Sequence, residues 1–402
     1  MNNEGESKPV TLSEAPHSLR PADAGELSRI LEKASTDKTS IFTGAPPKEK
    51  LDRSIFLDLS SLDRIVEHVQ EDMVITLETG IKIAELNSYL ARSGQWLPVH
   101  GSSQNSTVLE LIETGNGGPL DTGFGGPRNL VLGLDTIMAD GSSFKCGGKI
   151  VKNVTGYDLT KLLVGSRSWL GVSHRAHLRL FALPEYKEAL LVPLKSTEII
   201  PEFCKRLISS GIAIKVLEIA RVDFLSEKFE SFALVADYGH RQEVEESIDQ
   251  LENLASSVSG TGAIQRLNEG SLETILEKLS GYSISGDAGD DIVELSAPLK
   301  LIAEILDQVP ASSFNLRPVL GKLTLSINED QLGSLEDKLA CLTKQCSLAS
   351  AITLACRSGN DLYKVKSLSK VNQENDARLS ELKMTIKKRF DPEFILNPLV
   401  RF

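Results

Sequence analysis

The segment from Gly147 to Gly171, GGKIVKNVTGYDLTKLLVGSRSWLG, combines groups that can bind a cofactor carrying phosphates and an aromatic ring. Its two leading glycines let backbone amides approach an anion closely. Lys152 supplies a compact positive charge and Asn153 an amide. Tyr157 offers a ring for stacking and a hydroxyl donor. The spacing therefore predicts a cofactor-binding segment that ends in a turn into the next strand.

Glycine is concentrated around this segment. Fourteen of the 30 glycines lie between His100 and Gly171. Glycine weakens regular elements but allows the backbone to come close to a ligand. By composition alone, a ligand channel and a β-rich domain with many tight turns are equally good interpretations.

Other chemical signatures are missing or weak. The chain has no G-x-x-x-x-G-K-[ST] motif and no G-x-S-x-G motif. The run GNGGPLDTGFGG lacks both the spacing and the preceding strand of a dinucleotide-binding fingerprint. His174 and His177 are three residues apart in a predicted strand, so they point to opposite faces. We therefore predict no metal site.

The five cysteines contain no C-x-x-C pair, which predicts reduced thiols in a cytoplasmic protein. The net charge of −11 argues against a nucleic-acid partner, which would need clustered Lys and Arg. No segment reaches the roughly 18 apolar residues that a membrane helix requires. We expect a cytoplasmic protein, with peripheral contact to the inner face of a membrane left open.

The first half of the chain predicts strand, turn, strand and helix before the glycine-rich stretch. Helices are expected from Ala24 to Ser35 and over IKIAELNSYLARSG, which Gly94 would cap. Strands are expected around Phe56 and from Met73, and the residues Ile41 to Lys50 are expected to form a loop. Alternating apolar residues from Val172 to Leu180 predict a strand that stops at Pro184.

From Lys187 onward the pattern indicates strand, helix, two strands, helix and strand, which is the order of a ferredoxin-like unit. A similar order begins again near Asp291 and includes a helix over QLGSLEDKLACLTKQ. Two such units would form one antiparallel sheet with helices on one face. A charged helix ending near Phe390 and an irregular end complete the chain.

The Gly147–Gly171 segment resembles the FAD-binding domain of the vanillyl-alcohol-oxidase/PCMH superfamily, and within it the E subunit of glycolate oxidase (glycolate dehydrogenase). The family pattern is close to GG-x-x-x-KN-x-x-GYDL followed by GS-x-x-x-LG-V, and this chain matches each fixed position. The resemblance extends upstream through ITLETGIKIAELNSYLARSGQWLPV and VLGLDTIMADG, and returns in FDPEFILNPLVRF.

The resemblance implies an α+β fold: a PCMH-type FAD-binding domain of two α+β subdomains, plus a ferredoxin-like antiparallel-sheet cap domain. We expect a disordered tail over residues 1–23, the FAD-binding domain over 24–185 and the cap over 186–356. Residues 357–402 would form a C-terminal helix and tail that pack back on the FAD domain.

The resemblance also implies the residues that bind FAD non-covalently. Gly101 and Ser102 correspond to positions that contact the pyrophosphate, and Gly117 and Gly118 to a second turn facing the phosphates and flavin. The backbone of Val172 corresponds to the adenine end. The full predicted set is Gly101, Ser102, Thr107, Gly117, Gly118, Gly147, Gly148, Lys152, Asn153, Gly156, Tyr157, Asp158, Gly165, Gly171 and Val172. No residue is identified as a catalytic acid or base.

The resemblance implies an FAD-binding subunit of a glycolate or 2-hydroxyacid dehydrogenase complex. Its flavin would accept a hydride or relay electrons to an iron–sulfur subunit, beside a D-type flavin subunit. The family's first glycine triplet is here TGAPPKEK, and its T-[IL]-G-G is Thr107–Glu110. These differences favour an alternative hypothesis, a flavin-poor structural or regulatory subunit that keeps the fold. A stand-alone flavin oxidoreductase with another substrate is a third.

Overall fold

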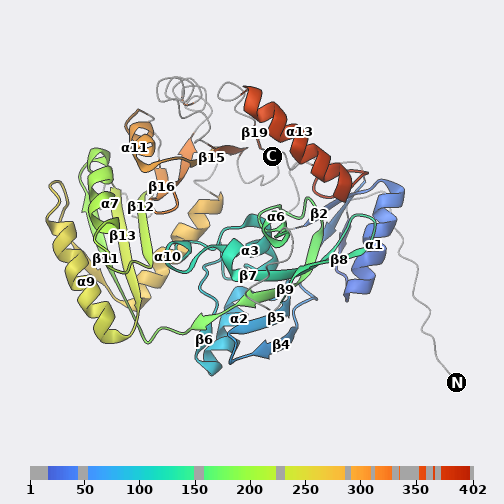
Figure 1. The fold of residues 1–402 in the computed structure, drawn as a ribbon, viewed down its shortest axis with the longest axis horizontal. Helices are drawn as coiled ribbons and strands as arrows, with labels where there is room; N and C mark the ends of the chain where they lie inside the picture. Colours follow the sequence, from blue (N-terminus) through green and yellow to red (C-terminus); the bar gives the residue numbers. More distant parts are fainter. Residues whose placement is uncertain are drawn as a thin grey trace.

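The computed structural model describes residues 17–43, 53–148, 158–222, 231–285, 291–308, 313–327, 335, 353–358, 365–366 and 373–398. These residues form an N-terminal domain and a cap domain that lie side by side, with the last helix returning to the N-terminal domain (Figure 1). The mixture of helices and antiparallel sheets confirms the predicted α+β fold class.

The N-terminal domain begins with a small parallel sheet covered by one helix. The sheet order is β1-β3-β2, and α1 packs Leu27, Ile30 and Leu31 against it. Asp23 caps α1 by accepting a hydrogen bond from the amide of Glu26. The elements are β1 (His17–Leu19), α1 (Ala24–Asp37), β2 (Ser40–Thr43) and β3 (Ser54–Leu57).

The prediction of a loop from Ile41 was wrong at its start. Ile41, Phe42 and Thr43 belong to β2, which pairs in parallel with β3. Ile41 and Phe42 are buried, so tertiary packing stabilises this strand. The segment is too short to show the alternation of apolar and polar residues that would predict a strand. The remaining residues of the predicted loop, 44–50, lie outside the described part of the chain.

A five-stranded antiparallel sheet in the order β4-β5-β9-β7-β8 forms the rest of the domain. Its central strand β9 buries Val172, Ala176 and Leu178, as the alternation predicted. Gly94 caps the 3-10 helix η1 (Ala91–Ser93), which continues α2 (Ile83–Leu90), with φ of 64°, as predicted for the end of this helical segment. The elements are β4 (Ile65–Val69), β5 (Val74–Glu78), α2 (Ile83–Leu90), η1 (Ala91–Ser93), β6 (Gln95–Trp96), α3 (Val108–Thr114), α4 (Asp121–Phe124), α5 (Pro127–Leu130), β7 (Val131–Ile137), β8 (Ser143–Gly147), α6 (Thr160–Leu163), β9 (Val172–Arg179) and β10 (Phe181–Ala182).

The cap domain is built on one antiparallel sheet, as the repeated pattern predicted. Its nine strands have the order β14-β11-β13-β12-β16-β17-β15-β18-β19, so β12 and β16 join the two units edge to edge. The elements are β11 (Tyr186–Leu194), η2 (Thr197–Ile199), α7 (Ile200–Ile208), β12 (Val216–Arg221), β13 (Ser231–Gly239), α9 (Arg241–Ser256), β14 (Gln265–Leu267), α10 (Glu269–Ser285), β15 (Asp291–Ser296), α11 (Leu299–Gln308), β16 (Ser313–Arg317), β17 (Lys322–Ile327), β18 (Thr353–Ser358) and β19 (Val365–Lys366).

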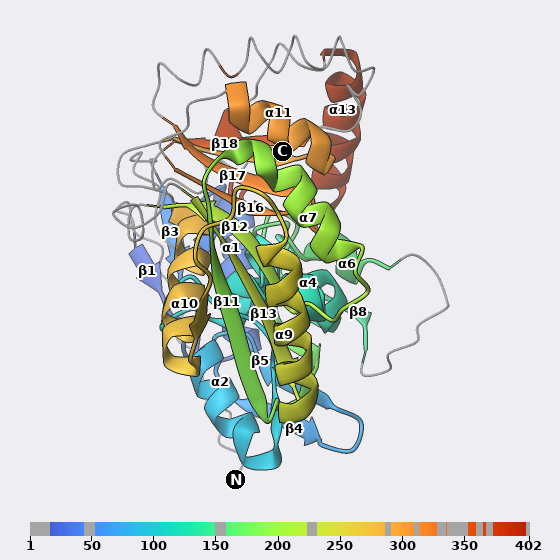
Figure 2. The ribbon, with the colours of Figure 1, turned by 90° about the vertical axis from the view of Figure 1, so that its left-hand side faces the viewer.

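The cap helices are not all on one face, contrary to the prediction. Helices α7, α9 and α11 cover the outer face, whereas α10 lies on the opposite, inner face (Figure 2). There α10 packs Leu272 and Leu276 beside Trp96 and Leu120 of the N-terminal domain. The sequence from Glu269 was not predicted as a helix, although Leu272, Ile275, Leu276 and Leu279 follow the i, i+3, i+4, i+7 spacing of one helical face. The helix predicted at residues 331–345 lies outside the described residues apart from Leu335.

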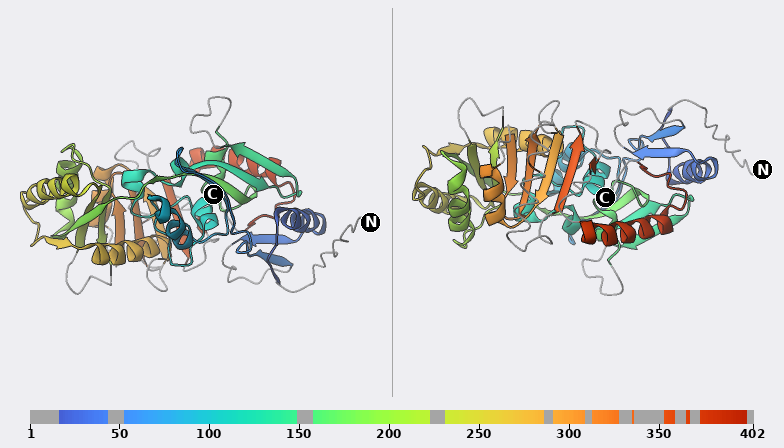
Figure 3. Two further views of the ribbon diagram at one scale, coloured as in Figure 1. Left: turned by 90° about the horizontal axis from the view of Figure 1, so that it is seen from below. Right: turned by 90° about the horizontal axis from the view of Figure 1, so that it is seen from above.

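The last described helix, α13 (Gln373–Phe390), lies along the N-terminal domain (Figure 3). Fully buried Lys387 donates hydrogen bonds from Nζ to Asp391 Oδ2 and to the carbonyls of Trp169 and Leu396, at 2.6, 2.6 and 2.8 Å. The segment after α13 then pairs with β2, because the amide of Ile41 donates to the carbonyl of Ile395 and the amide of Asn397 donates to the carbonyl of Ile41, both at 2.7 Å. Within the described residues, no helix has the length and apolar character needed to cross a membrane.

Candidate functional site

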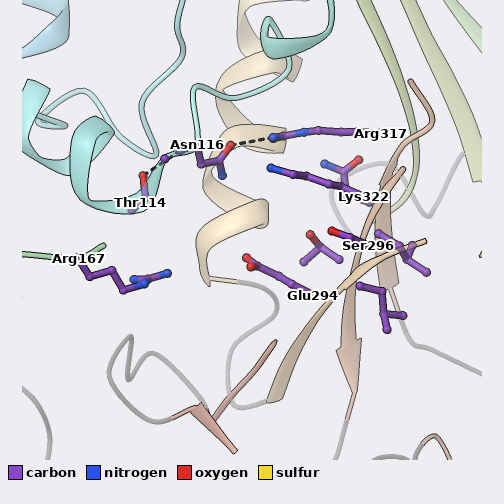
Figure 4. Close-up of a pocket in the computed structure, with 12 residues that line it drawn as sticks. Thr114, Asn116, Arg167, Glu294, Ser296, Arg317 and Lys322 are labelled. Atoms are coloured by element: carbon purple, nitrogen blue, oxygen red, sulfur yellow. Dashed lines mark hydrogen bonds between the residues drawn. The ribbon is translucent and has the colours of Figure 1, made fainter. Parts of the chain in front are cut away.

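A cavity of about 100 Å³, here named the junction cavity, lies where the N-terminal domain meets the second half of the cap sheet (Figure 4). Thr114, Gly115 and Asn116 line it from the end of α3, and Arg167 enters from the same domain. The opposite wall is formed by strands β15, β16 and β17. The cavity therefore uses residues far apart in the sequence.

The cap wall of the junction cavity comes from one pattern repeated on three adjacent strands. Each strand carries a polar–Leu–polar triplet, and the strand register aligns the triplets side by side. The central leucines turn to the outer core, so the polar residues face the cavity. The triplets are Asn315–Leu316–Arg317, Lys322–Leu323–Thr324 and Glu294–Leu295–Ser296. Sequence reasoning missed these residues, although the repeated triplet is a signal that could have revealed them.

Arg317 ties the cap to the N-terminal domain beneath this cavity. Its Nε donates to Glu218 Oε1 at 2.9 Å, and its Nη1 donates to Asn116 Oδ1 at 2.7 Å. The same Nη1 lies 3.8 Å from Asp121 Oδ2. Arg317, Glu218 and Asp121 are all buried. One guanidinium thus faces two carboxyl groups that come from different domains.

This group of charges alters the titration of its members. Burial raises the pKa of Glu218 to about 7, although Arg317 opposes the effect. Burial also raises the pKa of Asp121. Lys322, opposite Arg317 in the β16–β17 pair, has a lowered pKa because it is desolvated and because Arg317 repels its charge. Arg317 and Lys322 therefore place two neighbouring basic groups beside Glu218, whose pKa is raised to about 7.

A strained turn positions Arg167. Arg167 and Ser168 are consecutive non-glycine residues with positive φ, 52° and 53°. Such conformations cost about 1–3 kcal/mol each and persist only when surrounding contacts hold them. Here the amide of Arg167 donates to the carbonyl of Glu113 at 3.0 Å, and its carbonyl accepts from Asn397 Nδ2. The C-terminal segment therefore helps to hold the turn that carries Arg167.

A second cavity of about 390 Å³, the side cavity, adjoins the first and shares Thr114, Gly115 and Lys322 with it. Its volume falls within the range of cofactor sites, about 300–1,000 Å³. Gly165 contributes a backbone that leaves its Cβ direction almost open. The apolar part of the wall comes from Leu162, Val164, Trp169, Leu170 and Ile386, and Arg128 adds a positive charge near Lys322. These groups fit a flavin ring, which has an apolar end and a polar pyrimidine edge.

Helix α3 brings carboxyl groups to the boundary between the two parts of the N-terminal domain. Glu113 accepts hydrogen bonds from Thr43 Oγ1 of β2 and from Ser168 Oγ. Burial raises the pKa of Glu113, and neighbouring Glu110 adds to the effect. Glu110 in turn accepts from Ser102 Oγ at 2.5 Å. Unlike the side cavity, this boundary presents acidic groups, which suit a phosphate poorly.

Three residues predicted to bind the cofactor lie around the start of α3. Thr107 caps the helix by accepting from the amide of Glu110 at 3.2 Å. A side chain on Gly101 would come within 2.3 Å of Ser106 Cβ, so this glycine permits a tight turn. Ser102, Thr107 and Glu110 are thereby brought together. Their contact with FAD remains a prediction.

The predicted pairs of glycines serve close backbone packing. The amide of Gly117 donates to Asp121 Oδ2 at 3.2 Å, and Gly118 has φ of 86° beside the carbonyl of His100. Gly147 has φ of 65° and approaches the carbonyl of Leu132. Gly148 differs, because no atom of the described residues lies within 4 Å of its Cβ direction. Among the described residues, nothing therefore blocks the approach of a ligand to Gly148.

Of the other residues predicted to bind FAD, some lie in the part of the chain that the structure describes and some lie outside it. Gly171 packs against Thr136, and Val172 is fully buried opposite Ile137 in the β9–β7 pair. Asp158 is exposed and pairs with Lys161. Gly165 alone of the predicted and described residues lines the junction or side cavity. Lys152, Asn153, Gly156 and Tyr157 lie outside the described residues.

The histidines and cysteines of the described segments do not form a cluster. His177 Nδ1 lies 2.8 Å from Thr76 Oγ1, and His174 is buried in the same strand. No group of three potential metal-binding side chains occurs in the part of the chain that the structure describes. Cys146 and Cys204 are unpaired thiols. Burial raises the pKa of the Cys204 thiol to about 12.

Comparison with known proteins finds relatives for parts of the chain. Residues 16–147 match the model of an FAD binding domain family, FAD_binding_4. D-lactate dehydrogenase of Archaeoglobus fulgidus is 29% identical over 261 residues, which cover 61% of this chain and 57% of that protein. Glycolate oxidase subunit GlcE of Escherichia coli is 29% identical over 194 residues, covering 46% of this chain and 55% of that subunit. The chain thus spans little more than half the length of these relatives.

The fold is shared with solved structures at low sequence identity. The 4-ethylphenol oxidase of Gulosibacter chungangensis superposes with a TM-score of 0.69 at 13% identity, covering 96% of this chain and 89% of that one. This similarity shows the fold alone. Together with the matched domain, it confirms the resemblance predicted from the Gly147–Gly171 segment.

Proposed function

We propose that this chain, a member of the FAD-binding family of the glycolate oxidase subunits and D-lactate dehydrogenases, is the FAD-binding subunit of a 2-hydroxyacid dehydrogenase complex. Glycolate is the substrate we favour, and an iron–sulfur subunit and a D-type flavin subunit are the partners. The observation that carries the proposal is the pair of cavities that meet at Thr114, Gly115 and Lys322. One suits a flavin ring and the other a small polar molecule.

Bound FAD would supply the hydride-accepting centre, while the protein supplies position and electrostatics. The side cavity would hold the ring against Leu162, Val164 and Trp169. Lys322 lies in both cavities, so its positive charge would stabilise negative charge that develops on the pyrimidine edge. The cap sheet would cover the reacting atoms and limit the access of water.

A visible spectrum of the purified full chain, followed by denaturation and quantification of released FAD, tests the proposal. We expect a yellow protein whose flavin is bleached by glycolate under anaerobic conditions. Gly148→Glu should lower FAD occupancy without unfolding the protein, because it places a carboxylate beside the predicted cofactor segment, at a position where no described atom lies within 4 Å of the Cβ direction. Gly270→Glu on α10 is the matched control and should keep its FAD. A colourless protein that takes up no added FAD would refute the proposal.

The carboxyl groups of α3 favour a second candidate function. Glu113 already connects α3 to β2 and to the Ser168 turn, and Glu110 lies beside Ser102. A chain in which these contacts replace cofactor phosphates would be a flavin-poor structural or regulatory subunit. Titration with FAD separates the candidates, because the structural subunit would stay colourless. Under this candidate, Glu113→Ala should also leave FAD binding undetectable.

A further inference from the structure

Helix α10 carries a second stripe of residues besides the apolar stripe that packs under the cap sheet. Glu273, Glu277, Ser280 and Gly281 follow the spacing of one helical face. Each of them lies against residues 100–104 or 117–118 of the N-terminal domain, here named the cofactor turns. These turns include glycines that are predicted to contact FAD. A helix of the cap therefore lies directly on segments of the other domain that are predicted to bind the cofactor.

Two carboxylates of α10 hold the first cofactor turn. Glu273 Oε2 lies 3.3 Å from His100 Nε2, and Glu277 Oε1 accepts a hydrogen bond from Gln104 Nε2 at 2.8 Å. A cavity of about 180 Å³ is lined by this turn, by α2 and by both of these glutamates. On this side the turn is therefore held by polar contacts with α10 and not by close packing.

Two small residues of α10 come close to the cofactor turns. A Cβ atom on Gly281 would lie 3.2 Å from the carbonyl oxygen of Ser102. A Cβ atom on Gly118 would lie 2.8 Å from Ser280 Oγ, which is buried and has no hydrogen-bond partner among the described residues. The position of α10 and the shape of both turns therefore depend on each other.

His100 lies where the two cofactor turns and the cap meet. Its amide donates to the carbonyl of Gly117 at 2.8 Å, which joins the turns, and its side chain is only 18% exposed. The charged groups that face this side chain are Glu273 and Glu277 on α10 and Lys187 on β11, whose Nζ lies 2.8 Å from Glu273 Oε1. Burial lowers the pKa of His100, Glu273 opposes this effect, and Lys187 adds to it. His100 is therefore mostly neutral at pH 8 and gains a proton in mildly acidic solution.

We propose that α10 positions the cofactor turns, and that the contact between His100 and Glu273 strengthens FAD binding in mildly acidic solution. This role rests on the proposed function and adds control by the cap to the same site. A proton on His100 would strengthen its contact with Glu273, because hydrogen bonds between two charged groups are stronger than neutral ones. It would also place a positive charge beside the phosphates of FAD. By linkage, bound FAD would then raise the pKa of His100.

Titration of the full chain with FAD at pH 6 and pH 8, followed by the quenching of tryptophan fluorescence, tests this role. We expect the ratio of the Kd at pH 8 to the Kd at pH 6 to be at least about 5-fold larger for wild type than for His100→Gln, since about 5-fold is the lower end of usual coupling between two sites. Glu273→Gln should reduce the ratio in the same way, because the charge of Lys187 would then oppose protonation of His100. Both variants should bind FAD about as tightly as wild type at pH 8, which a general loss of structure would not allow.

A matched pair on the surface of the cap provides the controls. His240 Nδ1 also lies 3.3 Å from a carboxylate, Glu185 Oε2, but both side chains are exposed. His240→Gln and Glu185→Gln should therefore keep the affinity and the pH dependence of wild type. Circular dichroism at both pH values checks folding, and Glu273→Gln is the independent test if His100→Gln does not fold.

The outcomes separate this role from the proposed function. If wild type binds FAD and both variants keep the same ratio of Kd values, the role of α10 and His100 is overturned while the proposed function stands. A wild-type protein that takes up no FAD at either pH would refute the proposed function, and this role with it.

Discussion

Replacement of Glu218 by Gln should change how the stability of the protein depends on pH. Glu218 is fully buried on β12, accepts a hydrogen bond from Arg317 Nε and also hydrogen-bonds with the side chain of Asn315. Burial raises its pKa from the ordinary 4.5 to about 7. The folded state therefore binds a proton more tightly than the unfolded state does.

The sign of the effect follows from this difference. Between pH 4.5 and pH 7 the folded state holds more protons at this site, so the free energy of unfolding falls as pH rises. The stabilisation from Glu218 is fully present below pH 4.5 and is lost as pH rises through 7. At about 1.4 kcal/mol for each pKa unit, the loss amounts to about 3 kcal/mol. Gln does not titrate, yet its oxygen can still accept from Arg317.

Urea unfolding of wild type and Glu218→Gln at pH 5 and pH 8 measures the effect. We expect the stability of the variant relative to wild type to be about 3 kcal/mol more favourable at pH 8 than at pH 5. Glu202→Gln on α7 is the control, because its exposed pair with Arg206 should contribute little at either pH. The same stability difference between Glu218→Gln and wild type at both pH values would refute the reasoning.

Two further predictions concern the C-terminal segment and the thiols. Lys387→Met should reduce the free energy of unfolding by about 3–5 kcal/mol, because it leaves Asp391 buried without its charge partner. Urea titration measures this loss, and Lys388→Met, at an exposed position, is the control. Equal stability of both variants would contradict the role of Lys387. In the native protein at pH 8, a thiol reagent should not modify Cys204, because burial shields the thiol and raises its pKa to about 12. Mass spectrometry of labelled peptides measures the modification. Rapid labelling of Cys204 in the folded protein would contradict its buried position.

Local signals in the sequence predicted the parts of the fold whose residues obey a clear period. The alternation from Val172 to Leu180 correctly predicted β9, and Gly94 correctly predicted the end of the helical segment. The strand β2 was missed for a physical reason, because Ile41–Thr43 is too short to show a period and is set by pairing with β3. Helix α10 was overlooked, although Leu272, Ile275 and Leu276 begin a regular helical spacing that Leu279 completes.

The candidate site was harder to predict from the sequence, because the pairing register of three strands brings its residues together. Arg317, Lys322 and Glu294 come together only when β16, β17 and β15 pair in the observed alignment. A single residue slip would turn each polar member of the triplets toward the outer core. Arg167 was overlooked because it occupies an unspecified position of the family pattern. Its backbone has a positive φ, which the pattern does not show. The glycines that the pattern does specify mostly permit close backbone packing.

The two halves of the cap share an architecture but perform different tasks. The first half uses an apolar inner face to fix the cap on Trp96 and Leu120, so the position of the sheet is determined before any ligand arrives. The second half keeps polar side chains at the domain boundary, where they add to the apolar contacts of the first half. Arg317, on the strand that joins the halves, contacts both domains through Glu218 and Asn116. Since the Arg167 turn is held by Asn397, the C-terminal segment and the cap together determine the geometry of the junction cavity.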